Sequence, residues 1–111
     1  MANESVLQMV LLEEYSRLSR MIDGIYKELQ SLPKGYVSKK KIRGRDSFYL
    51  QWREGDKIKS KYISQQDVEM LSDMVRRRQE LEKNLRANKR DMKRLETSLG
   101  KDFIKSHIAE L

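Results

Sequence analysis

Apolar residues recur in alternating steps of four and three along the first part of the chain, with polar residues between them. This spacing places the apolar residues on one stripe of a helix and forms a heptad seam. The seam consists of Leu11, Tyr15, Leu18, Ile22, Ile25, Leu29 and Leu32. The pattern predicts a long amphipathic helix from Asn3 or Glu4 to Leu32. Pro33 is expected to end it, because proline cannot continue the helical hydrogen bonds.

A second heptad seam lies in the C-terminal half of the chain and is interrupted by two polar residues. Its members are Leu71, Met74, Arg78, Leu81, Leu85, Asn88, Met92, Leu95 and Leu99. Ser64 and Asp67 resemble a capping box in front of it, and Gly100 is suited to the C-terminal cap behind it. The sequence therefore predicts a second long helix after Ser64 and a short helical tail after Gly100.

The segment between the two helices has a period of two, which is the spacing of β-strands. It predicts three strands, Tyr36–Arg43, Ser47–Arg53 and Lys57–Ile63. Gly44-Arg45-Asp46 and Glu54-Gly55-Asp56 are expected to connect them, because glycine beside polar residues is typical of hairpin turns. One face of the sheet should carry Phe48, Leu50, Trp52, Ile58, Ser60 and Tyr62. The opposite face should carry Tyr49, Gln51, Arg53, Lys57, Lys59 and Lys61. The alternation thus predicts one apolar face and one basic face.

Together these elements predict an α+β fold: a long helix, a three-stranded antiparallel β-meander, a long helix and a short C-terminal helix. The two seams can pair, so we expect an antiparallel coiled-coil hairpin with the apolar face of the meander docked on it. We expect a single domain over residues 1–111, with helix 1–33, β-meander 34–63, helix 64–99 and helical tail 100–111. Because a two-helix core leaves apolar surface uncovered, we also expect a homo-oligomer.

The positive charge is concentrated in the predicted meander. The chain has 111 residues and a net charge of +7. Residues 34–62 hold ten basic and three acidic side chains, so this segment alone accounts for the whole excess. A surface of this kind attracts polyanions, which makes DNA or RNA the expected partner.

Other features of the composition narrow the class of protein. The chain has no cysteine, which excludes disulfides and cysteine chemistry. The N-terminus lacks the features of a signal peptide, and no stretch approaches the roughly 20 apolar residues of a membrane span. We therefore expect a cytoplasmic protein with no membrane partner.

The basic face of the meander is the candidate functional site. The side chains expected to contact nucleic acid are Lys39, Lys41, Tyr49, Gln51, Arg53, Lys57, Lys59 and Lys61. They combine cations that neutralise phosphates with an aromatic ring that can stack on a base. The alternative is a solvated lysine-rich face that prevents edge aggregation or meets an acidic protein.

The remaining candidates favour structural interpretations. Arg76-Arg77-Arg78 and the later basic pairs of the second helix are interleaved with acids, as on a solvated helix face. His107 has no neighbouring constellation for catalysis, and Trp52 is expected on the apolar face. No phosphate-binding loop, dinucleotide fingerprint or zinc spacing is present in the sequence. We therefore expect a non-enzymatic protein without a metal or other cofactor.

Several short motifs resemble known families. Leu32-Pro33-Lys34-Gly35, Lys41-Ile42-Arg43-Gly44, Phe48-Tyr49-Leu50-Gln51, Arg53-Glu54-Gly55 and Lys59-Ser60-Lys61-Tyr62 resemble an uncharacterised bacterial and archaeal module. In that family a basic three-stranded β-meander is followed by a coiled-coil helix. The segment is also similar, more weakly, to the arm-type DNA-binding domain of tyrosine recombinases. Those resemblances imply a β-meander between helices and, by analogy of fold, DNA binding.

Two functions follow as expectations. The first is an accessory nucleic-acid-binding protein associated with mobile elements, which contacts phosphates through the basic face of the meander. The second is a structural or adaptor module whose helices bind a protein partner or self-associate. Salt dependence separates them, because cations are released when a protein replaces them at phosphates.

Overall fold

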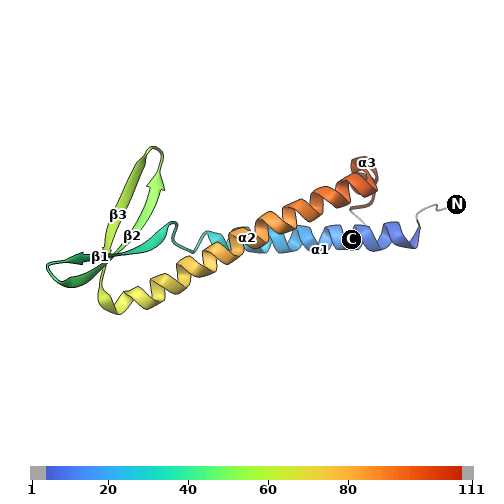
Figure 1. The fold of residues 1–111 in the computed structure, drawn as a ribbon. Coiled ribbons are helices and arrows are strands. Elements are labelled where there is room, and N and C mark those ends of the chain that lie inside the picture. The colour runs from blue at the N-terminus through green and yellow to red at the C-terminus, as the bar shows by residue number, and fades with distance from the viewer. Residues whose placement is uncertain (1–4, 109–111) are drawn as a thin grey trace. The chain divides into compact units, whose positions relative to one another are not determined.

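A computed structural model describes residues 5–108 (Figure 1). The element order is α1 (Val6–Leu29), β1 (Tyr36–Ile42), β2 (Arg45–Glu54), β3 (Lys57–Ile63), a 3-10 turn (Gln65–Asp67), α2 (Val68–Leu99) and α3 (Lys101–His107). The predicted α+β order, with its antiparallel three-stranded sheet and short last helix, is confirmed. The chain divides into two compact units, which are described in turn. The helical unit comprises Met1–Glu28 and Lys83–Leu111, and the sheet unit comprises Leu29–Glu82.

Helix α1 begins behind a capping box that the seam alone did not reveal. The Gln8 amide donates to Oγ of Ser5 at 3.1 Å, and the Ser5 amide donates to Oε1 of Gln8 at 2.9 Å. These two bonds satisfy backbone donors that the first helical turn leaves without partners. Asn3 and Glu4, where the helix was predicted to begin, lie outside the described residues.

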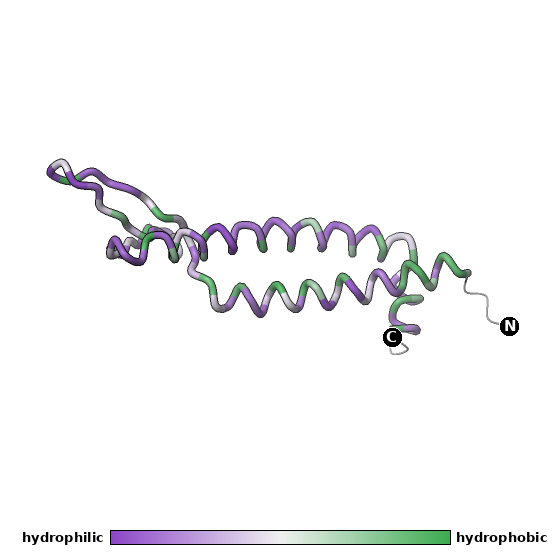
Figure 2. Tube along the Cα trace, turned by 90° about the horizontal axis from the view of Figure 1, so that it is seen from below, coloured by the Kyte–Doolittle hydropathy of each residue, from purple (hydrophilic) through white to green (hydrophobic). Residues whose placement is uncertain are grey.

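The core of the helical unit follows the predicted seam with one shift. The buried residues on its helices are Leu12, Leu18, Ile22, Ile25, Leu99 and Ile104. Leu12 is fully buried, whereas its neighbour Leu11, the predicted seam member, packs half-buried against the same cluster. Figure 2 shows the contrast between the strongly hydrophobic first turns of α1 and the mostly hydrophilic α2. This burial of apolar side chains holds the unit together.

Two contacts show that α1 and the second half of α2 run antiparallel in the helical unit. Nζ of Lys89 lies 5.1 Å from the ring centroid of Tyr26. Oη of Tyr15 donates to Oε1 of Glu96 at 3.4 Å. Burial raises the pKa of Tyr15, and the charge and hydrogen bond of Glu96 raise it further. The later residue of α2 therefore meets the earlier residue of α1.

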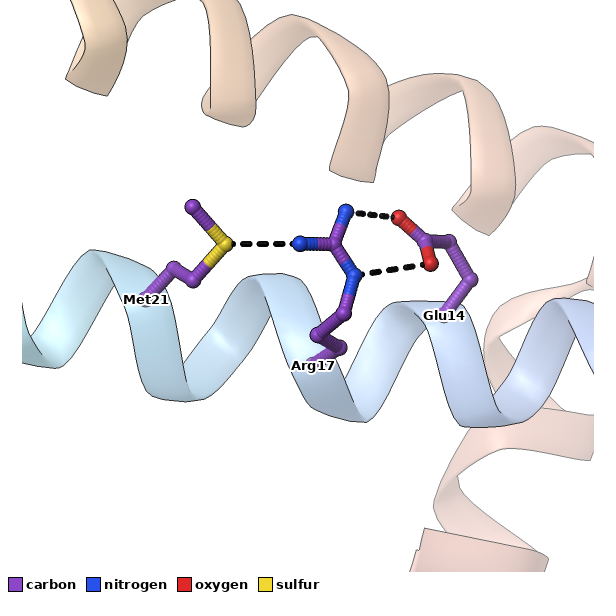
Figure 3. A network of polar contacts seen from close by, with 3 residues as sticks. All are labelled: Glu14, Arg17 and Met21. Atoms are coloured by element: carbon purple, nitrogen blue, oxygen red, sulfur yellow. Dashed lines mark hydrogen bonds and ion pairs between the residues drawn. The ribbon is translucent and has the colours of Figure 1, made fainter.

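Exposed charges on the helices pair with neighbours one turn away. Figure 3 shows Arg17 of α1 between Glu14 and Met21. Nε of Arg17 donates to Oε2 of Glu14 at 2.9 Å, and Nη1 donates to Sδ of Met21 at 2.8 Å. The hydrogen bonds from Arg17 lower the pKa of the Glu14 carboxyl below its ordinary value. Because both side chains are exposed, such a pair adds little to stability.

The sheet unit contains β1, β2 and β3 in that order, with antiparallel neighbours. Strand β2 is longer than predicted and begins at Arg45, while β1 ends at Ile42. Arg43 and Gly44 form the first turn with φ of 52° and 79°, and Gly55, with φ of 62°, opens the second turn. Positive φ at two successive residues, as at Arg43 and Gly44, is the signature of a type I′ turn, whereas glycine with positive φ at the first position alone, as at Gly55, fits a type II′ turn. In the two hairpins the paired strand ends, Ile42 with Arg45 and Glu54 with Lys57, enclose two residues each. Each hairpin loop therefore has two residues rather than the three predicted.

The path from α1 into the sheet depends on a close approach of backbone segments. Gly35 has φ of 100°, and a Cβ atom placed on it would lie 1.9 Å from the carbonyl oxygen of Gln51. Glycine is the residue that permits both the positive φ and this approach. Gly35 therefore allows the chain to enter β1 close beside β2.

Arg78 anchors the end of α1 within the sheet unit. Its Nη1 donates to the carbonyl oxygens of Leu29 and Leu32, at 2.9 Å each. Its Nε donates to Oε1 of Glu82 at 2.8 Å, and its side chain is 15% exposed. The Leu29 carbonyl oxygen also accepts the Leu32 amide, so Arg78 adds a charged donor at the end of α1, as basic side chains near a helix C-terminus can. The polar interruption of the second seam at Arg78 is therefore a structural contact.

Both predicted end signals of α2 lie where the sequence placed them. Oγ of Ser64 donates to Oδ2 of Asp67 at 2.8 Å, but Ser64 makes no side-chain bond to the backbone, and a 3-10 turn precedes the helix. The capping box is thus replaced by a bond between its two side chains. Gly100, with φ of 86°, separates α2 from α3, as expected.

Candidate nucleic-acid interface

The loop lengths decide which side chains share a face of the sheet. A two-residue loop pairs Glu54 with Lys57, and the register continues to Leu50 opposite Lys61 and Phe48 opposite Ile63. The predicted three-residue loop would instead pair Arg53 with Lys57. Because side chains alternate along a strand, a shift of one residue moves every side chain of the partner strand to the other face. The predicted division into one apolar and one basic face is therefore wrong.

The first hairpin changes in the same way. Its two-residue loop pairs Ile42 with Arg45, which sets Lys39 opposite Phe48 and Lys41 opposite Asp46. Lys39 and Lys41 consequently share a face with Phe48, Leu50 and Trp52. Since both hairpins shift, all the predicted lysines remain together, but on the face opposite to Tyr49, Gln51 and Arg53.

We call the first surface the lysine face. It contains Lys39, Lys41, Lys57, Lys59 and Lys61 on the outer strands, Phe48, Leu50 and Trp52 on the central strand, Val37 and Ile63 at the base, and the acids Asp46 and Glu54. The five lysines are exposed, whereas Ile63 is buried and the other apolar residues are half-buried. Nζ of Lys39 lies 3.3 Å from Oδ2 of Asp46. The lysine face is thus a row of cations on each side of a half-buried apolar strip.

The opposite surface is the tyrosine face. It contains Tyr36, Ser38, Lys40 and Ile42 of β1, Arg45, Ser47, Tyr49, Gln51 and Arg53 of β2, and Ile58, Ser60 and Tyr62 of β3. The rings of Tyr49 and Tyr62 lie 5.8 Å apart at an interplanar angle of 76°. Nζ of Lys40 lies 5.2 Å from the centroid of the Tyr49 ring. Tyrosine rings and cations therefore gather on this face.

The eight predicted contact residues are divided between the two faces. Lys39, Lys41, Lys57, Lys59 and Lys61 lie together on the lysine face, and Tyr49, Gln51 and Arg53 lie together on the tyrosine face. Sequence reasoning missed Tyr36, Lys40 and Tyr62 as neighbours of Tyr49. The sequence signal was Gly55-Asp56, because glycine at the first position fits a two-residue type II′ turn, whereas Arg43-Gly44 carries no such signal.

Some of the basic residues of α2 lie close to an acid one turn away. Nη1 of Arg76 lies 2.9 Å from Oδ1 of Asp73, and Nη1 of Arg77 lies 3.8 Å from Oε2 of Glu80. Arg94 pairs with Asp91. These i,i+3 pairs account for the charges of a solvated helix without a ligand.

His107 and Trp52 lie beside other side chains of the protein. The ring of His107 stacks on Phe103 with centroids 4.2 Å apart, and its Nδ1 lies 2.8 Å from the Phe103 carbonyl oxygen. Trp52 shares the lysine face with the β3 lysines, not with Ile58 and Tyr62. Within residues 5–108, no cluster of three or more histidine or carboxylate side chains is placed to hold a metal ion.

Comparison with known proteins identifies a family. A family model described as a domain of unknown function, DUF6788, matches residues 8–73. This stretch includes most of α1, the whole sheet and the start of α2. No curated protein and no solved structure matches the chain. Across the described helices, none is both long and apolar enough to cross a membrane. The expected resemblance to an uncharacterised family is therefore confirmed.

Proposed function

We propose that this chain, which belongs to the DUF6788 family of domains of unknown function, is an accessory nucleic-acid-binding protein. In this proposal the sheet contacts the phosphates. The lack of cysteine fits action in the reducing cytoplasm. The proposal rests on the surface of the sheet, because family membership carries no activity.

One observation carries this proposal: five exposed lysines gather on one face of the sheet. Lys57, Lys59 and Lys61 lie on alternate positions of β3, so successive lysines are about 6.8 Å apart along the strand. That spacing is close to the rise of two nucleotides in a duplex strand, at about 3.4 Å each. The two acids of the face, Asp46 and Glu54, leave most of the lysine charge uncompensated. The face can therefore follow a phosphate backbone.

Replacing Lys57, Lys59 and Lys61 together by serine tests the proposal. All three side chains are exposed, so the fold should persist, with at most about 0.5 kcal/mol lost per substitution. Binding to duplex DNA should weaken, and the slope of log K against log salt should fall by up to about three units. Fluorescence anisotropy at several salt concentrations measures both quantities.

The matched control replaces three cations of α2, Arg76, Arg77 and Lys89, by glutamine. Arg76 and Arg77 are paired with acids, and Lys89 lies over Tyr26, so this variant should change binding less. Equal binding by the wild type and the lysine variant, with both shown to be folded, would eliminate the lysine face as the site. If the wild type bound no DNA or RNA at low salt, nucleic-acid binding itself would be wrong.

A second candidate function, an adaptor or self-associating module, is favoured by the start of α1. Val6, Leu7 and Val10 are 83%, 65% and 54% exposed, which leaves an apolar patch on two turns of one helix. We propose that the helices of the helical unit form a coiled-coil hairpin, because Leu18, Ile22 and Ile25 are buried at heptad spacing. Light scattering of the wild type and of Leu7→Glu tests self-association. A monomer mass for both at every concentration would remove it.

A further inference from the structure

The tyrosine face has an aromatic side chain on each of its three strands. Tyr36 lies on β1, Tyr49 on β2 and Tyr62 on β3. Tyr62 lies directly opposite Tyr49, and Tyr36 is opposite Gln51, two positions along β2 from Tyr49. Cross-strand and diagonal neighbours on one face are within reach of aromatic side chains. The rings of Tyr49 and Tyr62 are therefore in contact, and Tyr36 lies on the same face in the diagonal position to Tyr49.

Two of these rings are exposed, and the third, Tyr49, is half-buried. Tyr36 is 51% exposed and Tyr62 is 62% exposed, and the flanking Ile42 and Ile58 are 45% and 61% exposed. The apolar side chains of the lysine face, by contrast, are buried or half-buried. Large apolar side chains that the sheet leaves uncovered on one face mark a binding surface.

The charges of the tyrosine face have one sign. Lys40, Arg45 and Arg53 share it, and among the sheet residues, all of which the structure describes, no carboxylate side chain lies on this face. Asp46 and Glu54 lie on the lysine face, because successive side chains of a strand alternate between the two faces. The charge therefore favours a ligand with anionic groups beside planar apolar groups, and a nucleic acid with accessible bases has both.

We propose that the tyrosine face binds single-stranded nucleic acid by stacking bases on Tyr36, Tyr49 and Tyr62 while Lys40, Arg45 and Arg53 contact phosphates. This proposal rests on the proposed function, nucleic-acid binding by the sheet, and adds a second surface that takes single strands. In a duplex the bases are stacked on one another and cannot reach the rings, whereas single strands present them. The rings of Tyr49 and Tyr62 are inclined at 76°, so each accepts a different base.

The test compares three probes on the full chain at low salt: a labelled thymidine oligonucleotide of about 12 nucleotides, an abasic oligonucleotide of the same length and charge, and a duplex. Stacking on an aromatic residue contributes about 1–3 kcal/mol per base, which is roughly a fivefold to 150-fold change in affinity. The thymidine strand should therefore bind at least about fivefold more tightly than the abasic strand.

Two variants locate the preference. The double variant Tyr36→Leu/Tyr62→Leu removes two exposed rings while it keeps apolar side chains that strands accept. It should lose the preference for the thymidine strand over the abasic strand. The matched control Ile42→Ser/Ile58→Ser removes exposed apolar area from the same face and keeps every ring, so the preference should remain. Circular dichroism establishes that each variant is folded.

Photocrosslinking with a 5-iodouracil oligonucleotide gives an independent measurement, with crosslinks expected at Tyr36, Tyr49 or Tyr62. Crosslinks confined to Trp52 and the lysine face would overturn the proposal. Equal affinity for the thymidine and abasic strands would also overturn it, while phosphate contact and the proposed function would stand. Absence of binding to any probe, duplex included, would remove both.

Discussion

The helices and the sheet differ in how their charged side chains are paired. On the helices, Arg17, Arg76 and Arg94 each lie near an acid three residues away. The three strands contain eight cations, and Nζ of Lys39 lies 3.3 Å from Oδ2 of Asp46. Several helical cations are thus paired with a neighbouring acid, whereas the sheet has few acids to pair with its cations.

The two regions also differ in the burial of their apolar side chains. The helical unit buries residues such as Leu12, Ile22 and Leu99. The sheet leaves Tyr36, Ile58 and Tyr62 more than half exposed. Apart from the exposed Val6, Leu7 and Val10 at the start of α1, folding explains the apolar side chains of the helical unit, because their burial contributes to stability. The exposed rings and uncompensated cations of the sheet contribute little to folding, which is why we assign the binding function to the sheet.

The largest expected difference between the regions is in their glycines. Gly35→Ala should destabilise the protein by about 3 kcal/mol or more, because the new methyl group would meet the Gln51 carbonyl oxygen and the backbone has positive φ. Gly24→Ala in α1 is the matched change, since a Cβ atom there meets nothing within 4 Å. It should stabilise the helix by up to about 1 kcal/mol. Urea unfolding followed by circular dichroism measures both.

Changes of equal size and sign at the two positions would contradict this contrast. They would mean that β1 and the segment before it do not approach β2 as closely as the Gly35 geometry requires.

Substitutions at Arg78 test whether this cation stabilises the fold. Arg78→Leu should cost about 2 kcal/mol, because the carbonyl groups of Leu29 and Leu32 lose a charged donor in a mostly buried site. Arg78→Lys should recover only part of this, since an ammonium lacks the planar fork that reaches two carbonyls and Glu82. Urea unfolding gives the values, with Arg76→Leu as the exposed control that should change stability by no more than about 0.5 kcal/mol. Full recovery by lysine would show that charge alone suffices.

The sequence predicted the elements of this fold because their patterns are local. The step of three and four identified α1 and α2, and Gly100 marked the end of α2. It did not predict the register of the sheet, because the pattern within a strand says nothing about which residue lies opposite. That depends on whether each turn has two or three residues, and Arg43 adopting a positive φ is unusual for a residue other than glycine. Each turn is one residue shorter than predicted. The residues of the predicted site therefore lie on two faces of the sheet instead of one.

The contacts of Arg78 could not be predicted from the sequence either. Its place in a run of three arginines indicated a solvated charge, while its place in the seam indicated a polar residue that could fix the register. Its carbonyl partners lie 49 and 46 residues away in the chain, so only the folded structure brings them together.

The smallest expected effect compares a tyrosine of the helices with a tyrosine of the sheet. Burial and Glu96 raise the pKa of Tyr15 above the ordinary value of 10.0. Its raised pKa means that the folded protein holds the phenol proton more tightly than the unfolded chain. The stabilisation is therefore complete below about pH 10, where both states are protonated, and is lost as the pH rises from there through the folded pKa.

Tyr15→Phe removes this titration and a hydrogen bond of 3.4 Å, so it should cost less than about 1 kcal/mol at pH 8. The difference in urea midpoint between wild type and variant should shrink as the pH rises above 10, because the wild type alone loses the contribution of Tyr15. Tyr62→Leu, at a position that is 62% exposed, should leave the midpoint nearly unchanged at pH 8 and weaken binding of single strands. Tyr15→Phe should leave that binding unchanged. If Tyr15→Phe impaired binding as much as Tyr62→Leu does, the assignment of stability to the helices and of recognition to the sheet would fail.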